Sequence, residues 1–113
     1  MDSREKACIC ARIIDEKKGI DPVILELRGM TALTDYFVVC SGTSDRQVQA
    51  IAEQLEKELK ARGIMPLGIE GRQEGRWVLL DYDDVIIHIL QETERGFYDL
   101  ENLWHECPRV AYP

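Results

Sequence analysis

The feature that most restricts the fold is an apolar run that leads directly into a helical pattern. The run "YFVVC" (36–40) is apolar throughout, which is typical of a strand buried on both faces of a sheet. The helix that follows is predicted to begin at a capping box formed by Ser44 and Gln47 and to end at Gly63. Its apolar stripe consists of Val48, Ile51, Ala52, Leu55 and Leu59. Because a short strand is predicted next, within "MPLGIEG" (65–71), this order predicts a right-handed parallel crossover.

Segments on either side extend this unit. A stripe of Ile9, Cys10, Ile13 and Ile14 predicts a first helix, which should stop at residues 17–19 with Gly19 as the left-handed cap. A turn at Asp21-Pro22 is followed by a strand, "VILEL" (23–27). Two further strands, "RWVLLDY" (76–82) and "VIIHIL" (85–90), flank a tight hairpin turn at Asp83-Asp84.

A last amphipathic helix is predicted within "FYDLENLW" (97–104), where Phe97, Leu100, Leu103 and Trp104 recur at helical spacing. Pro108 should end this segment, and residues 108–113 are expected to form a loose C-terminal tail. We therefore predict a single α/β domain over residues 1–107, built as a mixed β-sheet packed with helices. No internal repeat or second domain is indicated.

The charge of the chain favours one class of partner. With 14 basic and 21 acidic residues the net charge is −7. Direct nucleic-acid binding relies on Lys and Arg, so we expect little of it and favour a basic protein as partner. No apolar stretch approaches the roughly 20 residues that span a bilayer, and the N-terminus lacks a signal-peptide core. A cytoplasmic protein without membrane contact is expected.

The four cysteines do not have the spacing of a metal site. Cys8 and Cys10 lie about 200° apart around a helix, so they cannot face one ion from a helical segment. No paired Cys-x-x-Cys spacing is present, and His105 near Cys107 has no matching half. We expect reduced, mostly buried thiols and no metal site.

The turn "CSGTSDRQ" (40–47) could bind a phosphate or merely cap a helix. Gly42 can adopt a positive φ, and a helix N-terminus offers free amides to an anion. However, no lysine completes a phosphate-binding loop, and a nucleotidyltransferase needs two carboxylates one residue apart on the next strand. That strand has only Glu70, whereas Asp81 and Asp83 have the spacing but fall at a hairpin. A capped turn is the preferred interpretation.

Two aromatic residues bracket an apolar strand and suggest a protein-binding face. Trp77 and Tyr82 flank residues 78–80, beside the acidic Glu70 and Asp81. Aromatic anchors with carboxylates suit a basic partner, although a core position for Trp77 is an equal alternative on periodicity alone. His88 alternates with apolar residues in "VIIHILQ" and is expected to be a core or sheet-face histidine rather than a ligand or general base.

Four blocks of the sequence, in this order and spacing, resemble the Iojap family, the ribosomal silencing factors. They are "TDYFVVCSGTSDRQVQAIAEQL", "GIEG", "WVLLDYDDVIIHIL" and "ERGFYDLENLW", and the resemblance extends from about Ile14 to Trp104. It implies a nucleotidyltransferase-like fold that lacks the catalytic carboxylates, which would make the Gly-Thr-Ser turn a remnant of an ancestral substrate site. One departure is Asp83, where the family commonly has glycine.

The resemblance also implies a function. Family members bind the large ribosomal subunit through a ribosomal protein of the L-fourteen family and block docking of the small subunit, which represses translation when nutrients are short. This action is steric, so no enzyme activity and no cofactor are expected, and the resemblance suggests a homodimer. The contact residues carried over are Trp77, Leu79, Asp81 and Tyr82, with Glu70 and Tyr98 nearby. A degenerate nucleotidyltransferase and a dimeric adaptor for another basic protein remain the alternatives.

Overall fold

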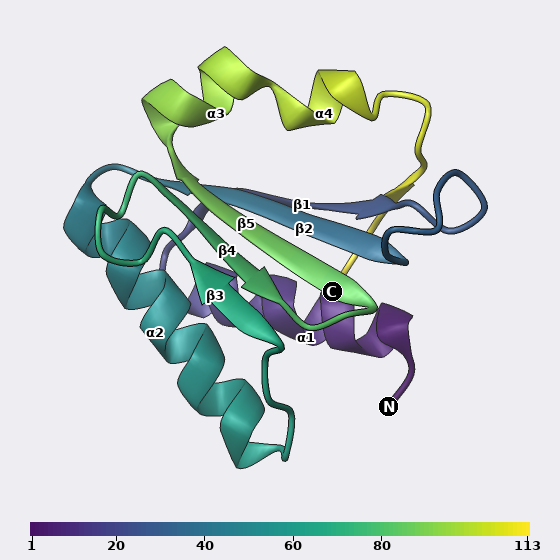
Figure 1. Cartoon of the computed structure of the whole chain (residues 1–113), viewed down its shortest axis with the longest axis horizontal. Coiled ribbons are helices and arrows are strands. Elements are labelled where there is room, and N and C mark those ends of the chain that lie inside the picture. The colour runs from purple at the N-terminus through teal and green to yellow at the C-terminus, as the bar shows by residue number, and fades with distance from the viewer.

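The computed structural model describes all residues, 1–113, as ten elements around one sheet (Figure 1). In chain order these are α1 (Ser3–Glu16), β1 (Ile20–Glu26), β2 (Tyr36–Gly42), α2 (Asp45–Ala61), β3 (Gly68–Glu70), β4 (Trp77–Asp81), β5 (Val85–Gln91), α3 (Glu92–Tyr98), α4 (Leu100–Leu103) and β6 (Arg109–Val110). The predicted α/β class and mixed sheet are confirmed. No helix is both long and apolar enough to cross a membrane.

The six strands follow the order β3-β4-β5-β2-β1-β6. Only β2 and β5 pair in parallel, and every other pair is antiparallel. Because β3, β5 and β2 all run in one direction, the connection through α2 is a parallel crossover, as predicted. It ends at the sheet edge, however, since the hairpin of β4 and β5 occupies the places between β3 and β2.

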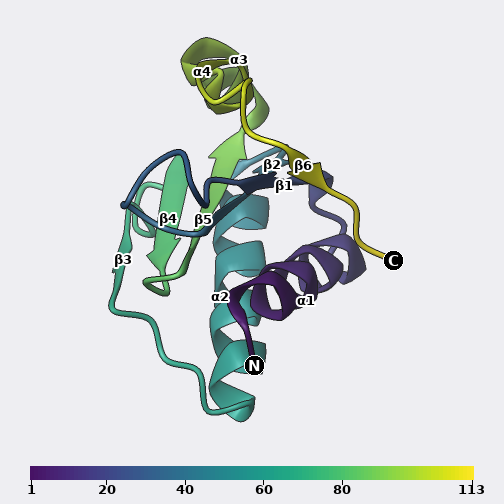
Figure 2. The ribbon, with the colours of Figure 1, turned by 90° about the vertical axis from the view of Figure 1, so that its right-hand side faces the viewer.

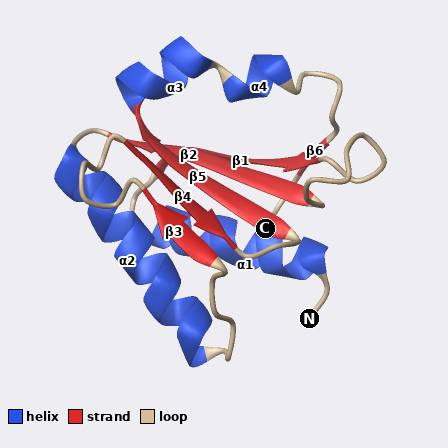
Figure 3. Ribbon diagram, in the orientation of Figure 1, coloured by secondary structure: helices blue, strands red, loops and turns tan.

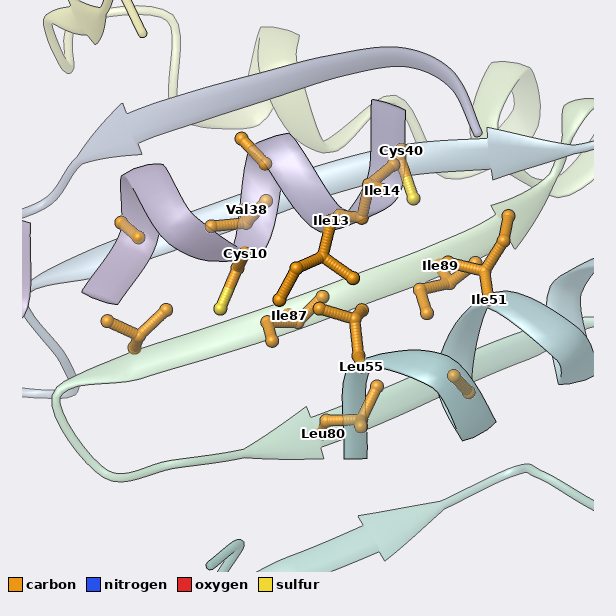
Figure 4. Close-up of a cluster of buried hydrophobic side chains, with 14 of the residues drawn as sticks. Cys10, Ile13, Ile14, Val38, Cys40, Ile51, Leu55, Leu80, Ile87 and Ile89 are labelled. Atoms are coloured by element: carbon orange, nitrogen blue, oxygen red, sulfur yellow. The ribbon is translucent and has the colours of Figure 1, made fainter. Parts of the chain in front are cut away.

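The sheet separates two helical layers (Figures 2 and 3). Helices α1 and α2 cover one face, where buried side chains from both helices meet those of the central strands (Figure 4). A smaller apolar cluster on the opposite face lies under α3, α4 and the chain that follows them, with Leu100 and Trp104 packed against it. The strand predicted at 36–40 is buried along its whole length because both faces are covered.

The caps of the two long helices agree in part with the predictions. Ser44 caps α2 by accepting from the Gln47 amide (3.1 Å), but the Gln47 side chain accepts from the amide of Thr43 (2.6 Å) rather than from that of Ser44. Gly63 has the expected left-handed φ of 78°. After α1 the left-handed residue is Lys18 (φ 61°) and not Gly19, so that prediction is wrong.

Glycine is required at position 19 because the backbone there passes close to the Ile14 side chain, and not because of a positive φ. A Cβ at this position would lie 2.3 Å from the Cγ2 atom of Ile14, inside the contact between the end of α1 and the start of β1. The turn predicted at Asp21-Pro22 lies inside β1, where the pairing with β2 shifts register and Asp21 has a φ of 47°. β1 therefore begins before the predicted strand.

The C-terminal predictions need two corrections. The single helix predicted at 97–104 is broken into α3 and α4 at Asp99, which adopts the left-handed conformation (φ 47°). The tail is not loose, because Arg109–Val110 pairs with β1 as an edge strand. In addition, the hydroxyl of Tyr112 donates to Asp15 Oδ2 on α1 (2.8 Å). An edge strand this short has too little periodicity to be recognised in the sequence.

Candidate protein-binding face

The register of the β3–β4 pair assembles most of the predicted contact residues on one surface. Along β4, Trp77, Leu79 and Asp81 alternate with buried residues and point away from α1 and α2. Glu70 lies directly opposite Leu79 and therefore on the same face. Tyr98 at the end of α3 packs on the Trp77 indole, with ring centroids 4.7 Å apart. We call this surface, formed by Glu70, Trp77, Leu79, Asp81 and Tyr98, the Trp77 face.

The Trp77 face combines partly exposed rings with carboxylates around a shallow hollow. The hollow has a volume of about 250 Å³ and is lined by Glu70, Gly71, Trp77 and Leu79. Trp77 and Leu79 are half-buried and also contact the smaller apolar cluster, whereas Tyr98 is half exposed and Glu70 is exposed. Trp77 is therefore neither a core residue nor a fully exposed one. Part of its side chain packs against the smaller apolar cluster, and the rest is accessible.

Tyr82 does not belong to this face. Its side chain is 4% exposed and packs in the main core between the sheet and the helices α1 and α2. The reason is the two-residue period of a strand, which places residue 82 on the side opposite to residues 77, 79 and 81. Burial raises the pKa of the Tyr82 hydroxyl, which has no hydrogen-bond partner. The predicted contact role of Tyr82 is therefore corrected to a core role.

His88 lies beneath the Trp77 face, as the expected sheet-face histidine. It is 5% exposed, and its Nδ1 accepts a hydrogen bond from the Trp77 indole N–H (3.1 Å). An indole nitrogen only donates, so the His88 ring is neutral and its proton sits on Nε2, which has no partner. Burial lowers the pKa of His88 from 6.5 to about 4, which keeps the ring neutral.

The hairpin turn next to the Trp77 face contains a left-handed residue, Asp83. Asp83 has a φ of 72°, a positive value that Asp tolerates better than most residues. The Asp83 amide donates to Asp81 Oδ1 (2.8 Å), and the Thr34 hydroxyl donates to the Asp83 carbonyl (2.9 Å). One oxygen of Asp81 is therefore engaged within the turn, which holds its carboxylate at the rim of the face.

The residues of the alternative nucleotidyltransferase site are not brought together. Gly42 pairs with Gln91 at one end of β5, whereas Asp81 pairs with Ile86 near the other end. These ends are five residues apart, about 17 Å at the rise of a strand. Gly42 does not adopt a positive φ; instead a Cβ there would press on Val48 at 3.0 Å. No group of three or more His, Cys, Asp or Glu side chains is arranged to hold a metal ion.

The cysteines are free thiols, as expected, and three of the four are buried. Burial raises the pKa of Cys10 and of Cys40 to about 12, so both stay protonated in the core. Neither thiol has the low pKa that is typical of a nucleophilic cysteine.

Arg95 is a structural residue of the site that the sequence did not single out. Its guanidinium donates to the carbonyls of Ile20 (3.0 Å) and Asp21 (2.8 Å), to Ser41 Oγ (2.9 Å) and to Glu101 Oε2 (2.9 Å). These contacts anchor α3, and with it Tyr98, to the sheet. No local pattern signals them, because three of the four acceptors lie more than fifty positions away in the chain.

Exposed apolar side chains on α3 and α4 were also missed. Phe97 and Leu103 were expected on a buried stripe, but they are 80% and 69% exposed. The break at Asp99 rotates the two halves of the predicted helix relative to each other and so splits the stripe. Asp99, a poor helix former inside the predicted segment, was the available signal.

Comparison with known proteins adds an independent finding. The family model described as "Ribosomal silencing factor during starvation" matches residues 1–113. The chain is 38% identical over 110 residues to the ribosomal silencing factor RsfS of Halalkalibacterium halodurans, covering 97% of this chain and 94% of that protein. It is 39% identical over 108 residues to RsfS of Bacillus subtilis, covering 96% and 92%. A crystal structure of a Chromobacterium violaceum protein superimposes with a TM-score of 0.90 at 32% identity, covering 99% of this chain and 92% of that one.

Proposed function

The chain belongs to the family of ribosomal silencing factors, and we propose that it binds the large ribosomal subunit and sterically blocks joining of the small subunit. The observation that carries the proposal is the family match over the whole chain. Following the resemblance, we propose that the contact is made through a ribosomal protein of the L-fourteen family and that translation is repressed under nutrient limitation. A factor that only occupies a surface needs no catalytic group and no cofactor.

The Trp77 face is proposed as the contact surface for that ribosomal protein. It offers partly exposed rings, which are common anchors of protein interfaces, beside the carboxylates of Glu70 and Asp81. The net charge of −7 would favour encounter with a basic partner and would repel RNA phosphates. Most of the binding energy would then come from the aromatic and apolar residues, and the carboxylates would contribute orientation and speed of association.

A purely regulatory role is proposed over nucleotide chemistry. The distance of about 17 Å along β5 between the Gly42 turn and Asp81 supports this choice, since no single nucleotide phosphate group could contact both. We also propose that the fold is related to that of the nucleotidyltransferases. The Gly-Thr-Ser turn between β2 and α2 supports this proposal, because a nucleotidyltransferase has a similar turn between a strand and a helix. We further propose a homodimer in the cytoplasm, and the exposed side chains of Phe97 and Leu103 support self-association.

Gradient sedimentation tests the central proposal. The purified protein is mixed with separated ribosomal subunits, and the large-subunit fraction should contain it while the small-subunit fraction should not. Addition of both subunits should then give fewer joined ribosomes as the protein concentration rises. Joining at the normal level with a saturating amount of bound protein would refute the steric mechanism.

A second measurement addresses the enzyme alternative. Calorimetric titration with nucleoside triphosphates and magnesium should give no binding heat, because the enzyme alternative requires a bound nucleotide. Magnesium-dependent nucleotide transfer that is abolished by Asp81→Ala would establish the alternative instead.

A further inference from the structure

The Trp77 indole packs against the smaller apolar cluster and Tyr98, and it makes one hydrogen bond, to His88. Tyr98 packs on the ring at a centroid distance of 4.7 Å, and the indole N–H donates to His88 Nδ1 at 3.1 Å. Packing contacts have no strong directional preference, whereas a hydrogen bond at the edge of the indole favours one orientation. His88 therefore supplies the directional part of the constraint.

His88 is itself held in place, so it can serve as a fixed acceptor. Its side chain is buried, and the Phe37 ring packs edge-on against the imidazole at a centroid distance of 4.5 Å. Its backbone pairs with Leu79 on one side and with Val39 on the other, in the middle of the sheet. A side chain with so little freedom transfers its position to the group that it binds.

Because Nε2 of His88 has no hydrogen-bond partner, any role of its polar ring depends on Nδ1, which accepts from Trp77. Burying a polar N–H without a partner is unfavourable, and an apolar residue would fill a site in this cluster without that cost. The only hydrogen bond that the ring makes is the one to Trp77. The structure therefore offers one gain from the imidazole, which is the fixed orientation of the indole.

We propose that His88 is a positioning residue for partner binding, which holds the Trp77 indole in its binding orientation before the partner arrives. The inference rests on the proposed function, because it assigns to Trp77 a contact with the partner. A side chain that is ordered in advance loses less freedom on binding, so removing the hydrogen bond should weaken binding about three- to tenfold.

A matched pair of variants tests this role. His88→Leu and His88→Asn place side chains of the same shape at the site, but only the amide oxygen of Asn can accept from the indole, at the position of Nδ1. The Leu variant should be the more stable of the two because it buries no unpaired amide. The Asn variant should nevertheless bind the large subunit more tightly, close to the unchanged protein. Equal binding by both variants, or tighter binding by the Leu variant, would overturn the proposal.

The indole N–H gives a spectroscopic readout that a purely structural role would not change in this way. In a nitrogen–proton NMR spectrum the chain has two indole signals, from Trp77 and Trp104. The Trp77 signal should shift and its N–H should exchange faster in the His88→Leu variant, and both effects should be reversed by Asn. An unchanged Trp77 signal in the Leu variant would contradict the proposal.

A double-variant cycle separates failure of this inference from failure of the proposed function. Trp77→Phe keeps a ring but removes the donor, so His88→Leu should have little further effect on binding in that background. If Trp77→Ala leaves binding unchanged, the Trp77 face is misplaced and the inference falls with it. If Trp77→Ala weakens binding but His88→Leu is as costly with Phe at position 77 as with Trp, the face stands and the positioning role of His88 is refuted.

Discussion

Gly71 lies directly against the backbone of Trp77. A Cβ on Gly71 would be 2.0 Å from the Trp77 carbonyl oxygen, and Gly71 has a φ of 80°, so both space and backbone conformation require glycine. This contact closes the turn between β3 and β4 and sets the point at which β4 begins. The position of the Trp77 face thus depends on a residue without a side chain.

Gly71→Ala should therefore lower the free energy of unfolding by at least about 2 kcal/mol, because the new Cβ adds a steric clash to an unfavourable φ. Gly68→Ala, at the start of β3, is the matched control, since a Cβ there meets nothing within 4 Å and its φ is not in the left-handed region. Urea denaturation measures both variants. Equal stability of the two would show that the β3–β4 turn can relax.

Trp77→Ala should weaken binding to the large subunit by about 2 kcal/mol or more, because truncating a central aromatic anchor typically has this effect. The protein should stay folded, since Trp77 is only half-buried and a fully buried aromatic would cost about 3–5 kcal/mol of stability. Binding is measured by sedimentation and folding by thermal melting. Met65→Ala, at an exposed apolar residue between α2 and β3, should change neither. A collapse of the melting temperature would make Trp77 a core residue and contradict the assignment.

Ser44→Ala should lower the free energy of unfolding by about 1 kcal/mol, because the Gln47 amide loses its capping oxygen at 3.1 Å. Binding to the large subunit should be unchanged, since Ser44 is not part of the Trp77 face, although β2 stops at the end of the sheet where β4 begins. Chemical denaturation and sedimentation are the two measurements. A variant that is equally stable but does not bind would identify the Gly-Thr-Ser turn as a contact site.

Arg95→Lys should destabilise the protein by about 1–3 kcal/mol although it keeps the charge. An ammonium cannot span the two carbonyls, the Ser41 hydroxyl and the Glu101 carboxylate that the guanidinium contacts together, so partly buried acceptors lose their donor. The same change at exposed Arg4 on α1 should be neutral, and denaturant unfolding compares them. Similar midpoints for the two variants would mean that solvent replaces the contacts of Arg95.

Stability should fall as the pH is lowered from 7 to 5, and His88 should account for part of the fall. Burial lowers the His88 pKa from 6.5 to about 4, so between these values the unfolded chain binds more protons than the folded one. The stabilisation is present above pH 6.5 and is lost progressively as the pH approaches 4, by about 2 kcal/mol at pH 5. Denaturation at several pH values should show a shallower slope for His88→Leu. The same slope in both proteins would place the titrating group elsewhere.

Much of the fold is determined by the sequence through local chemistry. The capping residue Ser44, the stop at Gly63 and the apolar stripe of α2 act within a few residues, so their effects were readable without a structure. The hairpin was readable for the same reason, and Asp83 supplies its positive φ. The hairpin register also brings Trp77 close to His88, because residues 77 and 88 are diagonal neighbours across β4 and β5.

Tertiary structure alone decided which residues of the candidate site share a surface. The strand period places Tyr82 and Asp81 on opposite sides of the sheet, but the packing of α1 and α2 decided which side is the core, and it buries Tyr82. Tyr98 reaches Trp77 because Arg95 anchors α3 through acceptors far away in the chain, and β6 forms because β1 offers a free edge. Such contacts depend on elements that are remote in sequence, and a local pattern carries no information about which remote element will supply the partner.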